Sequence, residues 1–231
     1  MITLNKTITS GGENRTYILD VPYNTGEPMP VWFNFHGLGG TGAAAKTSFD
    51  MERVCNSNGF IAVHPDGLNK TWRQTGTNNK DMGMVTDILN YIIGQYFVDI
   101  TRIFSSGFSM GGIFTHLMAT RMQDVFQATG AVAASLSPGI LSSCGPMPMM
   151  MIHSVNDGLV PYSSGLTALE FWKGRNISSE PPVVNGICSG WSGTAYTVFS
   201  TITGADHRET WNTDINGGFP VGDALWDFFK Q

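Results

Sequence analysis

The sequence has few charged residues and no long apolar run. Charged side chains make up 13% of the 231 residues, the 13 lysines and arginines form no basic run, and the formal net charge is −5. The chain therefore lacks the clustered positive charge that neutralises nucleic-acid phosphates. No stretch approaches the roughly 18 apolar residues of a membrane-spanning helix. We expect a soluble chain with neither a nucleic-acid nor a membrane partner.

Cysteine is also scarce, which excludes a disulfide-rich scaffold. Cys55, Cys144 and Cys188 allow at most one disulfide, and the sequence leaves open which two would form it. None of them lies in a CxxC or Cys/His spacing, so the sequence indicates no metal site and no cofactor. The 42% of apolar residues supply a sizeable core, and the length fits one domain over residues 1–231. The oligomeric state stays open.

Short apolar runs alternate with helical patterns along the chain. Strands are expected at 15–21, 31–35, 60–63, 102–106, 128–134, 149–153 and 196–201. Helices are expected at 43–56, 84–97, 110–122, 162–172 and 221–229, with Asp81 as an N-cap. This alternation predicts a mostly parallel sheet with helices on both faces. No insertion is long enough for a large cap domain, so ligands should bind openly at the carboxyl ends of the strands.

The segment Gly107-Phe108-Ser109-Met110-Gly111 lies between an expected strand and an expected helix. In that context a G-x-S-x-G string indicates a nucleophile elbow, a sharp turn that exposes the serine hydroxyl. Glycines on both sides avoid clashes with the neighbouring chain. We therefore predict Ser109 as a nucleophile, against the alternative of a glycine-rich turn with an incidental serine.

A serine nucleophile needs a histidine base, and three histidines follow Ser109. His116 lies within the helix after the elbow and points away from it, and His153 ends a strand, where a structural role is expected. His207 lies late in the chain in a polar loop, in agreement with the order serine, acid, histidine. We predict His207 as the base.

The acid that orients the base should lie between the two. Asp157 comes directly after a buried strand and is the first choice, although Gly158 also suits a turn-capping carboxylate. Asp206 is adjacent to His207 and would need an awkward backbone to reach it. Glu170 falls in an expected helix, and Glu180 precedes a double proline.

Acyl transfer also needs two N–H donors for the oxyanion, each contributing about 3 to 4 kcal/mol. Met110, directly after the nucleophile, supplies one. The string His36-Gly37-Leu38-Gly39-Gly40 follows an upstream strand, and the Leu38 N–H is expected as the second donor. His36 itself is expected to be structural.

Five ordered motifs carry a resemblance to a known family: HGLGG at 36–40, HPDG at 64–67, RIFSSGFSMGG at 102–112, HSVNDGLVPY at 153–162 and GADHRETW at 204–211. Together they resemble the α/β-hydrolase esterases grouped as polyhydroxybutyrate depolymerase-like and feruloyl esterase-like, which stand with the carbohydrate esterases. The resemblance implies an α/β-hydrolase fold with Ser109, Asp157 and His207 as catalytic triad and Leu38 and Met110 as oxyanion donors. It also implies a secreted or periplasmic enzyme. Ser154 stands where such families usually carry glycine, and three residues separate His207 from Trp211.

The resulting hypothesis is a metal-free serine esterase that acts through an acyl-enzyme on feruloyl or acetyl esters of plant polysaccharide. Polyester cleavage is the alternative, and an inactive polysaccharide-binding relative or an acyltransferase are alternatives of other kinds. Polar loops at 66–80, 174–192 and 206–219 are expected to form the substrate rim. Their aromatic residues Trp72, Trp191 and Trp211 are predicted to bind substrate, or else to anchor each loop to the core.

Overall fold

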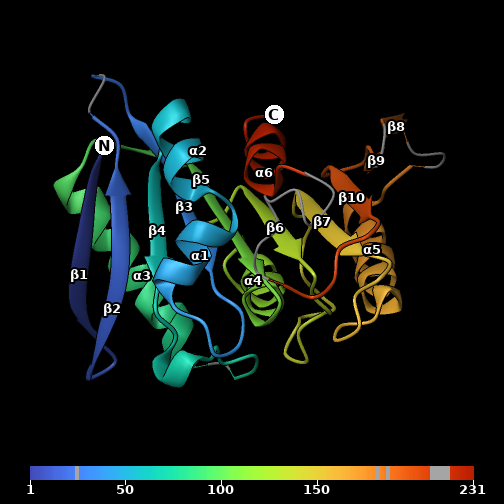
Figure 1. The fold of residues 1–231 in the computed structure, drawn as a ribbon, viewed down its shortest axis with the longest axis horizontal. Coiled ribbons are helices and arrows are strands. Elements are labelled where there is room, and N and C mark those ends of the chain that lie inside the picture. Colours follow the sequence, from blue (N-terminus) through green and yellow to red (C-terminus); the bar gives the residue numbers. More distant parts are fainter. Residues whose placement is uncertain (24–25, 77, 180–182, 186–187, 209–218) are drawn as a thin grey trace.

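The computed structural model describes residues 1–23, 26–76, 78–179, 183–185, 188–208 and 219–231. Within these residues the strands form one ten-stranded sheet in the order β1-β2-β4-β3-β5-β6-β7-β10-β9-β8 (Figure 1). The strands are β1 (Ile2–Ser10), β2 (Glu13–Val21), β3 (Met29–Phe35), β4 (Ile61–Pro65), β5 (Val98–Phe108), β6 (Ala128–Val132), β7 (Met149–Ser154), β8 (Val183–Asn185), β9 (Cys188–Trp191) and β10 (Thr197–Ile202). The helices are α1 (Gly42–Ser48), α2 (Met51–Asn58), η1 (Leu68–Lys70), α3 (Lys80–Gln95), α4 (Met110–Arg121), α5 (Tyr162–Asn176) and α6 (Val221–Phe229).

The centre of the sheet is parallel, as the alternating pattern predicts. β4, β3, β5, β6, β7 and β10 pair in parallel with one another in this order, and β2 pairs antiparallel with β4. Every residue of β3 is buried, which explains why this strand is an almost continuous apolar run. The carboxyl ends of these strands meet at one edge of the sheet, where the loops that carry function are expected.

Both ends of the sheet are antiparallel. At one end β1 pairs with β2, and at the other β9 pairs with β10 and with β8. The sequence analysis placed no strand at 2–10 or within 174–192. β1 is an edge strand with only Ser10 buried, so its composition carries little of the apolar signal that marks a core strand.

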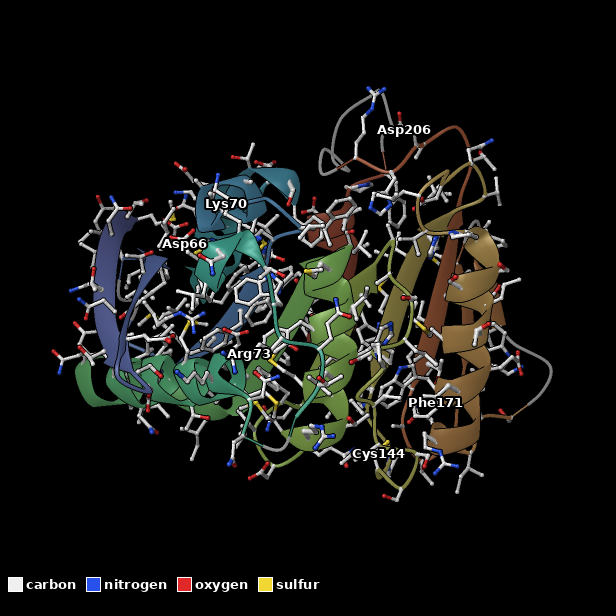
Figure 2. The ribbon with its side chains drawn as sticks, turned by 90° about the horizontal axis from the view of Figure 1, so that it is seen from below. Asp66, Lys70, Arg73, Cys144, Phe171 and Asp206 are labelled. Carbon is white, nitrogen blue, oxygen red and sulfur yellow. The ribbon has the colours of Figure 1, made fainter. Side chains whose placement is uncertain are left out.

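Helices cover both faces of the sheet, which confirms the predicted α/β-hydrolase architecture. One apolar cluster packs α3, α4 and α5 on one face, and a second packs α2 and α6 on the other. Figure 2 shows α3, α4 and α5 along one side of the sheet, with Phe171 of α5 among them, and α1 and α2 on the opposite side. Within the described residues no helical cap covers the carboxyl edge. None of the described helices combines the length and apolar character that crossing a membrane requires.

Two helix starts differ from the expectation. The single helix expected at 43–56 is divided, because Asp50 takes a left-handed backbone with φ 51° between α1 and α2. Asn79, not Asp81, caps α3: its side chain accepts the N–H groups of Asp81 and Met82. Asp81 instead forms a buried ion pair with Arg15 at 2.7 Å.

Candidate active site

The elbow forms where β5 passes directly into α4. Ser109 lies between them with φ 53° and ψ −118°, a backbone conformation that L-residues adopt only at a cost of about 1 to 3 kcal/mol. The turn is possible because its glycines leave room. A Cβ at Gly111 would lie 2.1 Å from the Phe35 carbonyl oxygen, and one at Gly107 would lie 2.3 Å from the Gly111 carbonyl carbon. The two glycines of the motif are therefore steric requirements of the turn.

Three side chains from distant parts of the chain meet above this turn. His207 Nε2 lies 2.8 Å from Ser109 Oγ, and His207 Nδ1 lies 2.7 Å from Asp157 Oδ2. Both distances are hydrogen bonds, so the serine, the imidazole and the carboxylate form one connected chain. The Phe108 ring packs against the imidazole with 4.9 Å between ring centroids. His207 follows β10 in the loop on which Figure 2 labels Asp206.

Asp157 divides its two carboxylate oxygens between two tasks. Oδ1 accepts the N–H groups of Leu159 and Val160 at 2.9 and 2.8 Å, which closes the turn after β7. Oδ2 is left for His207. The sequence analysis weighed a turn-capping role of Asp157 against a catalytic one. The structure shows that the two roles are compatible, because Oδ1 caps the turn and Oδ2 is free to serve His207.

Two polar residues tie the Asp157 loop to the His207 loop. Buried Ser154 Oγ donates to the Ala205 carbonyl oxygen at 2.6 Å, and Asn156 Oδ1 accepts the Gly204 N–H at 3.0 Å. Ser154 is one of the positions at which the sequence departs from the family it resembles. The hydroxyl at this position provides a direct bond that fixes the segment just before His207.

Leu38 and Met110 both lie next to the serine. Met110 is the first residue of α4, and Leu38 lines the same hollow as Ser109 and His207. The loop that carries Leu38 is held by bonds from Gly39 N–H to the Lys70 carbonyl and from Gly40 N–H to the Gly37 carbonyl. Within the described residues neither the Leu38 nor the Met110 N–H has a hydrogen-bond partner. Their role as oxyanion donors stays a prediction.

His36 is structural, and it explains where Trp72 lies. His36 Nε2 accepts the Gly67 N–H at 2.9 Å and Nδ1 donates to the Gly37 carbonyl oxygen at 2.7 Å, so both ring nitrogens are used inside the fold. The Trp72 indole N–H donates to the His36 carbonyl at 2.8 Å, and its ring stacks on Phe114 at 5.3 Å. Trp72 is only 2% exposed. The expectation that it binds substrate is corrected: it anchors the 66–80 loop to the core.

Trp191 is corrected in the same way. It ends β9, which the sequence analysis read as a loop, and it is buried in the cluster under α5. Lys173 Nζ lies 5.1 Å from its ring centroid, so the helix covers its face. Trp211, the third predicted substrate contact, lies outside the described residues.

The remaining candidates take no part in the three-residue chain. Buried His116 Nδ1 accepts the Trp172 indole N–H at 3.0 Å, and burial lowers the pKa of His116 to about 3. Asp206 pairs with Arg208 at 2.6 Å, and Glu170 with Lys173 at 3.3 Å. Glu180 lies outside the described residues. The three cysteines are free thiols.

The hollow above the serine has a volume of about 380 Å³ and a partly apolar wall. It is lined by Gly37, Leu38, Gly39, Gly40, Phe108, Ser109, Leu159 and His207. Leu38 and Leu159 are 68% and 71% exposed, although large apolar side chains are usually covered. The sequence analysis did not identify Leu159. The sequence signal that could have identified it is the apolar side chain two positions after Asp157, in a loop expected at the site.

Comparison with known proteins finds similar chains among proteins named as esterases. The prolyl oligopeptidase family matches residues 47–138, a segment that includes the elbow. Feruloyl esterase C of Emericella nidulans is 27% identical over 96% of this chain and 87% of its own length. Among solved structures, acetyl xylan esterase from Aspergillus awamori has a TM-score of 0.77 at 15% identity, covering 98% of this chain and 99% of its own. A ferulic acid esterase from Anaeromyces mucronatus, in complex with ferulic acid, has a TM-score of 0.68 at 15% identity, over 100% of this chain and 89% of its own.

These likenesses bear on three expectations. The α/β-hydrolase fold is confirmed by the structural neighbours. The resemblance to feruloyl esterase-like carbohydrate esterases, drawn from five motifs, is confirmed by the sequence relatives. The expectation of an enzyme that hydrolyses carboxylic esters agrees with the sequence relatives, which are named as feruloyl esterases.

Proposed function

We propose that the protein is a serine esterase that removes feruloyl or acetyl groups from plant polysaccharide by way of an acyl-enzyme. The observation that carries the proposal is the pair of hydrogen bonds on His207, one to Ser109 Oγ at 2.8 Å and one to Asp157 Oδ2 at 2.7 Å. A hydroxyl, an imidazole and a carboxylate in this order are the groups that acyl transfer requires. The sequence relatives named as feruloyl esterases support the substrate class.

The reaction would proceed in two halves. His207 Nε2 takes the Ser109 proton as Oγ attacks the ester carbonyl, and the imidazolium is stabilised by ionised Asp157. The oxyanion accepts the N–H groups of Leu38 and Met110, and the imidazolium then protonates the departing alcohol. Water, deprotonated by His207, attacks the acyl-serine. The bond between the acyl carbon and Oγ then breaks, and the His207 imidazolium returns the proton to Ser109 Oγ as the acid leaves. No metal or cofactor enters either half.

The walls of the hollow favour an apolar acyl group. Leu38 and Leu159 present exposed aliphatic side chains beside Ser109. A feruloyl ring would bury apolar area against both, at roughly 25 cal/mol per Å². An acetyl group would fit the hollow but would gain little from the leucines. We therefore place feruloyl esters ahead of acetyl esters as the preferred substrates.

We also propose that residues 1–231 act as one domain and that the enzyme works outside the cytoplasm.

The experiment is an ester panel run on the wild type and on Ser109→Ala. Methyl ferulate, p-nitrophenyl acetate, acetylated xylan and a polyhydroxybutyrate suspension are compared at equal enzyme concentration. The expected result is turnover of methyl ferulate with the highest kcat/KM and no detectable turnover by Ser109→Ala. Clearing of the polyester without ferulate release would replace the substrate assignment. Polysaccharide binding with no turnover of any ester would contradict the enzymatic proposal itself.

A further inference from the structure

A second histidine, His153, lies against the same carboxylate as His207. It is the fifth residue of β7 and is buried. Its Nε2 is 2.9 Å from the Val160 carbonyl oxygen and 3.6 Å from Asp157 Oδ2, the oxygen that binds His207. A carbonyl oxygen can only accept, so Nε2 carries the hydrogen.

Val160 links this histidine to the turn that holds the acid. Its N–H donates to Asp157 Oδ1 at 2.8 Å, and its carbonyl accepts from His153 Nε2. One residue therefore connects the end of β7 with the carboxylate. The 3.6 Å separation from Asp157 Oδ2 is too long for a hydrogen bond, but it leaves the positive end of the N–H dipole close to the negative oxygen.

The fold makes room for this imidazole. A Cβ on Gly165 of α5 would lie 2.6 Å from His153 Nδ1 and 2.9 Å from its Cγ. Tyr162 of the same helix meets the ring edge to face at 6.0 Å. The helix thus has its glycine opposite the ring and an aromatic side chain beside it, which fixes the ring plane.

The charge state of His153 agrees with a donor role. Burial lowers its pKa, while the Val160 carbonyl and the Asp157 charge raise it and His207 lowers it further. The groups that face it are Asp157 in its own loop, His207 after β10, His116 of α4 and Tyr162 of α5. A neutral imidazole places a dipole, not a second cation, beside the carboxylate and so does not compete with the His207 imidazolium.

We propose that His153 is a positioning residue of the triad, which clamps the Asp157 turn through Val160 and directs an N–H toward the oxygen that binds His207. The inference rests on the proposed function. It predicts that His153 acts on kcat through Asp157 and contributes little to substrate binding.

The test compares His153→Phe, which keeps the ring without its donor, with His153→Gln, whose amide N–H can reach the position of Nε2. With p-nitrophenyl acetate, His153→Phe is expected to lower kcat about tenfold and to change KM less than about twofold. His153→Gln is expected to recover most of the loss. Wild-type kcat in His153→Phe, or equal losses in both variants, would overturn the proposal.

A double-mutant cycle separates this role from a general structural one. In an Asp157→Asn background, where the acid no longer stabilises the imidazolium, His153→Phe is expected to lower kcat less than about twofold further. The same tenfold loss in both backgrounds would overturn the proposal. Activity retained by Ser109→Ala would contradict the proposed function instead. Loss of activity in Ser109→Ala and Asp157→Asn with wild-type kcat in His153→Phe would contradict this inference alone.

A glycine pair on α5 provides a second route should His153→Phe not fold. Gly165→Ala forces the His153 ring to move, whereas a Cβ on Gly174 of the same helix meets nothing within 4 Å. We expect kcat to fall several-fold, to about a fifth, in Gly165→Ala and to stay at the wild-type value in Gly174→Ala. Equal kcat in the two variants would overturn the proposal.

Discussion

Within the described residues, aspartate and histidine side chains meet at two places in the fold, and only one of these places lies beside Ser109, the proposed nucleophile. Asp157 and His207 lie 2.7 Å apart at the carboxyl edge of the sheet, with the His207 side chain 9% exposed. Asp20 and His64 lie 3.4 Å apart between β2 and β4, and both side chains are fully buried. The first pair faces the hollow above Ser109. The second faces the interior.

The comparison of these two places shows that an aspartate next to a histidine does not by itself indicate a catalytic site. Burial by itself would raise the pKa of Asp20, but the neighbouring His64 and hydrogen bonds from Thr3 and Lys46 together lower it to about 2. Burial lowers the pKa of His64, so this imidazole is neutral. Lys46 Nζ, 2.9 Å from Asp20, balances the buried charge. The interior pair therefore holds β2, β4 and α1 together. The other pair differs in that its histidine is hydrogen-bonded to Ser109.

The largest expected contrast comes from removing the two carboxylates in turn. Asp157→Asn keeps an oxygen for the Leu159 and Val160 N–H groups but no longer stabilises the His207 imidazolium. We expect kcat on p-nitrophenyl acetate to fall about 10⁴-fold, with the free energy of unfolding changed by less than about 1 kcal/mol. A loss of stability as large as that of Asp20→Asn would remove the distinction between the pairs.

Asp20→Asn should show the reverse pattern. It leaves the Lys46 ammonium without its buried partner, so we expect the free energy of unfolding in urea to fall by about 3 kcal/mol. The kcat of the folded protein should stay at the wild-type value. Glu52→Gln is the matched control, because Glu52 also pairs with Lys46 but its side chain is 63% exposed. The control should change stability by less than about 1 kcal/mol.

The pH dependence of stability should reveal the interior pair in two steps. Unfolded His64 binds a proton below its ordinary pKa of 6.5, whereas burial lowers the pKa of the folded side chain, so stability falls as the pH drops below 6.5. Folded Asp20 has a pKa of about 2 against 3.8, so its contribution is present above pH 3.8 and is lost as the pH falls toward 2.

Urea unfolding over a pH series measures both steps. His64→Asn should reduce the slope between pH 6 and 4 by up to about one proton, or about 1.4 kcal/mol per pH unit. The remaining slope is shared with buried His116 and His153, whose pKa values are also lowered by burial. An unchanged slope would show that His64 titrates equally in both states.

The smallest expected effect concerns the apolar wall beside the exposed pair. Leu159→Ala should raise KM for methyl ferulate about fivefold and leave kcat/KM for p-nitrophenyl acetate within about twofold, because only the larger acyl group would touch the side chain. Leu141→Ala, on an exposed leucine outside the hollow, is the control. An equal effect on both esters would indicate that Leu159 acts through the loop backbone.

Much of this fold can be predicted from the sequence because its central strands are buried on both faces. The almost continuous apolar run of β3 and the helical spacing in α3 and α4 mark these elements directly. β1 carries no such mark, because it is an edge strand and buries little of its surface. β9 carries none because its four residues are too few to show a periodic pattern. The break between α1 and α2 depends on one left-handed residue, Asp50, which no periodicity indicates.

The candidate site divides in the same way. Ser109, Asp157 and His207 could be predicted because chain order and strand ends determine where they meet. Trp72 and Trp191 could not, because a loop's sequence does not tell whether its aromatic side chain turns outward to a ligand or inward to the core. The Trp72 side chain turns inward, because its indole N–H donates to the His36 carbonyl oxygen beneath the loop.

The two hydrogen-bonding roles of the Asp157 carboxylate require a side chain of this length. One oxygen organises the turn and the other faces His207, and both are reached from a single methylene. Glutamate would shift both oxygens outward by about 1.5 Å, the length of one carbon–carbon bond. The longer acid could satisfy the backbone or the imidazole but not both. A glutamate could therefore replace Asp157 only if the backbone of the turn after β7 changed as well.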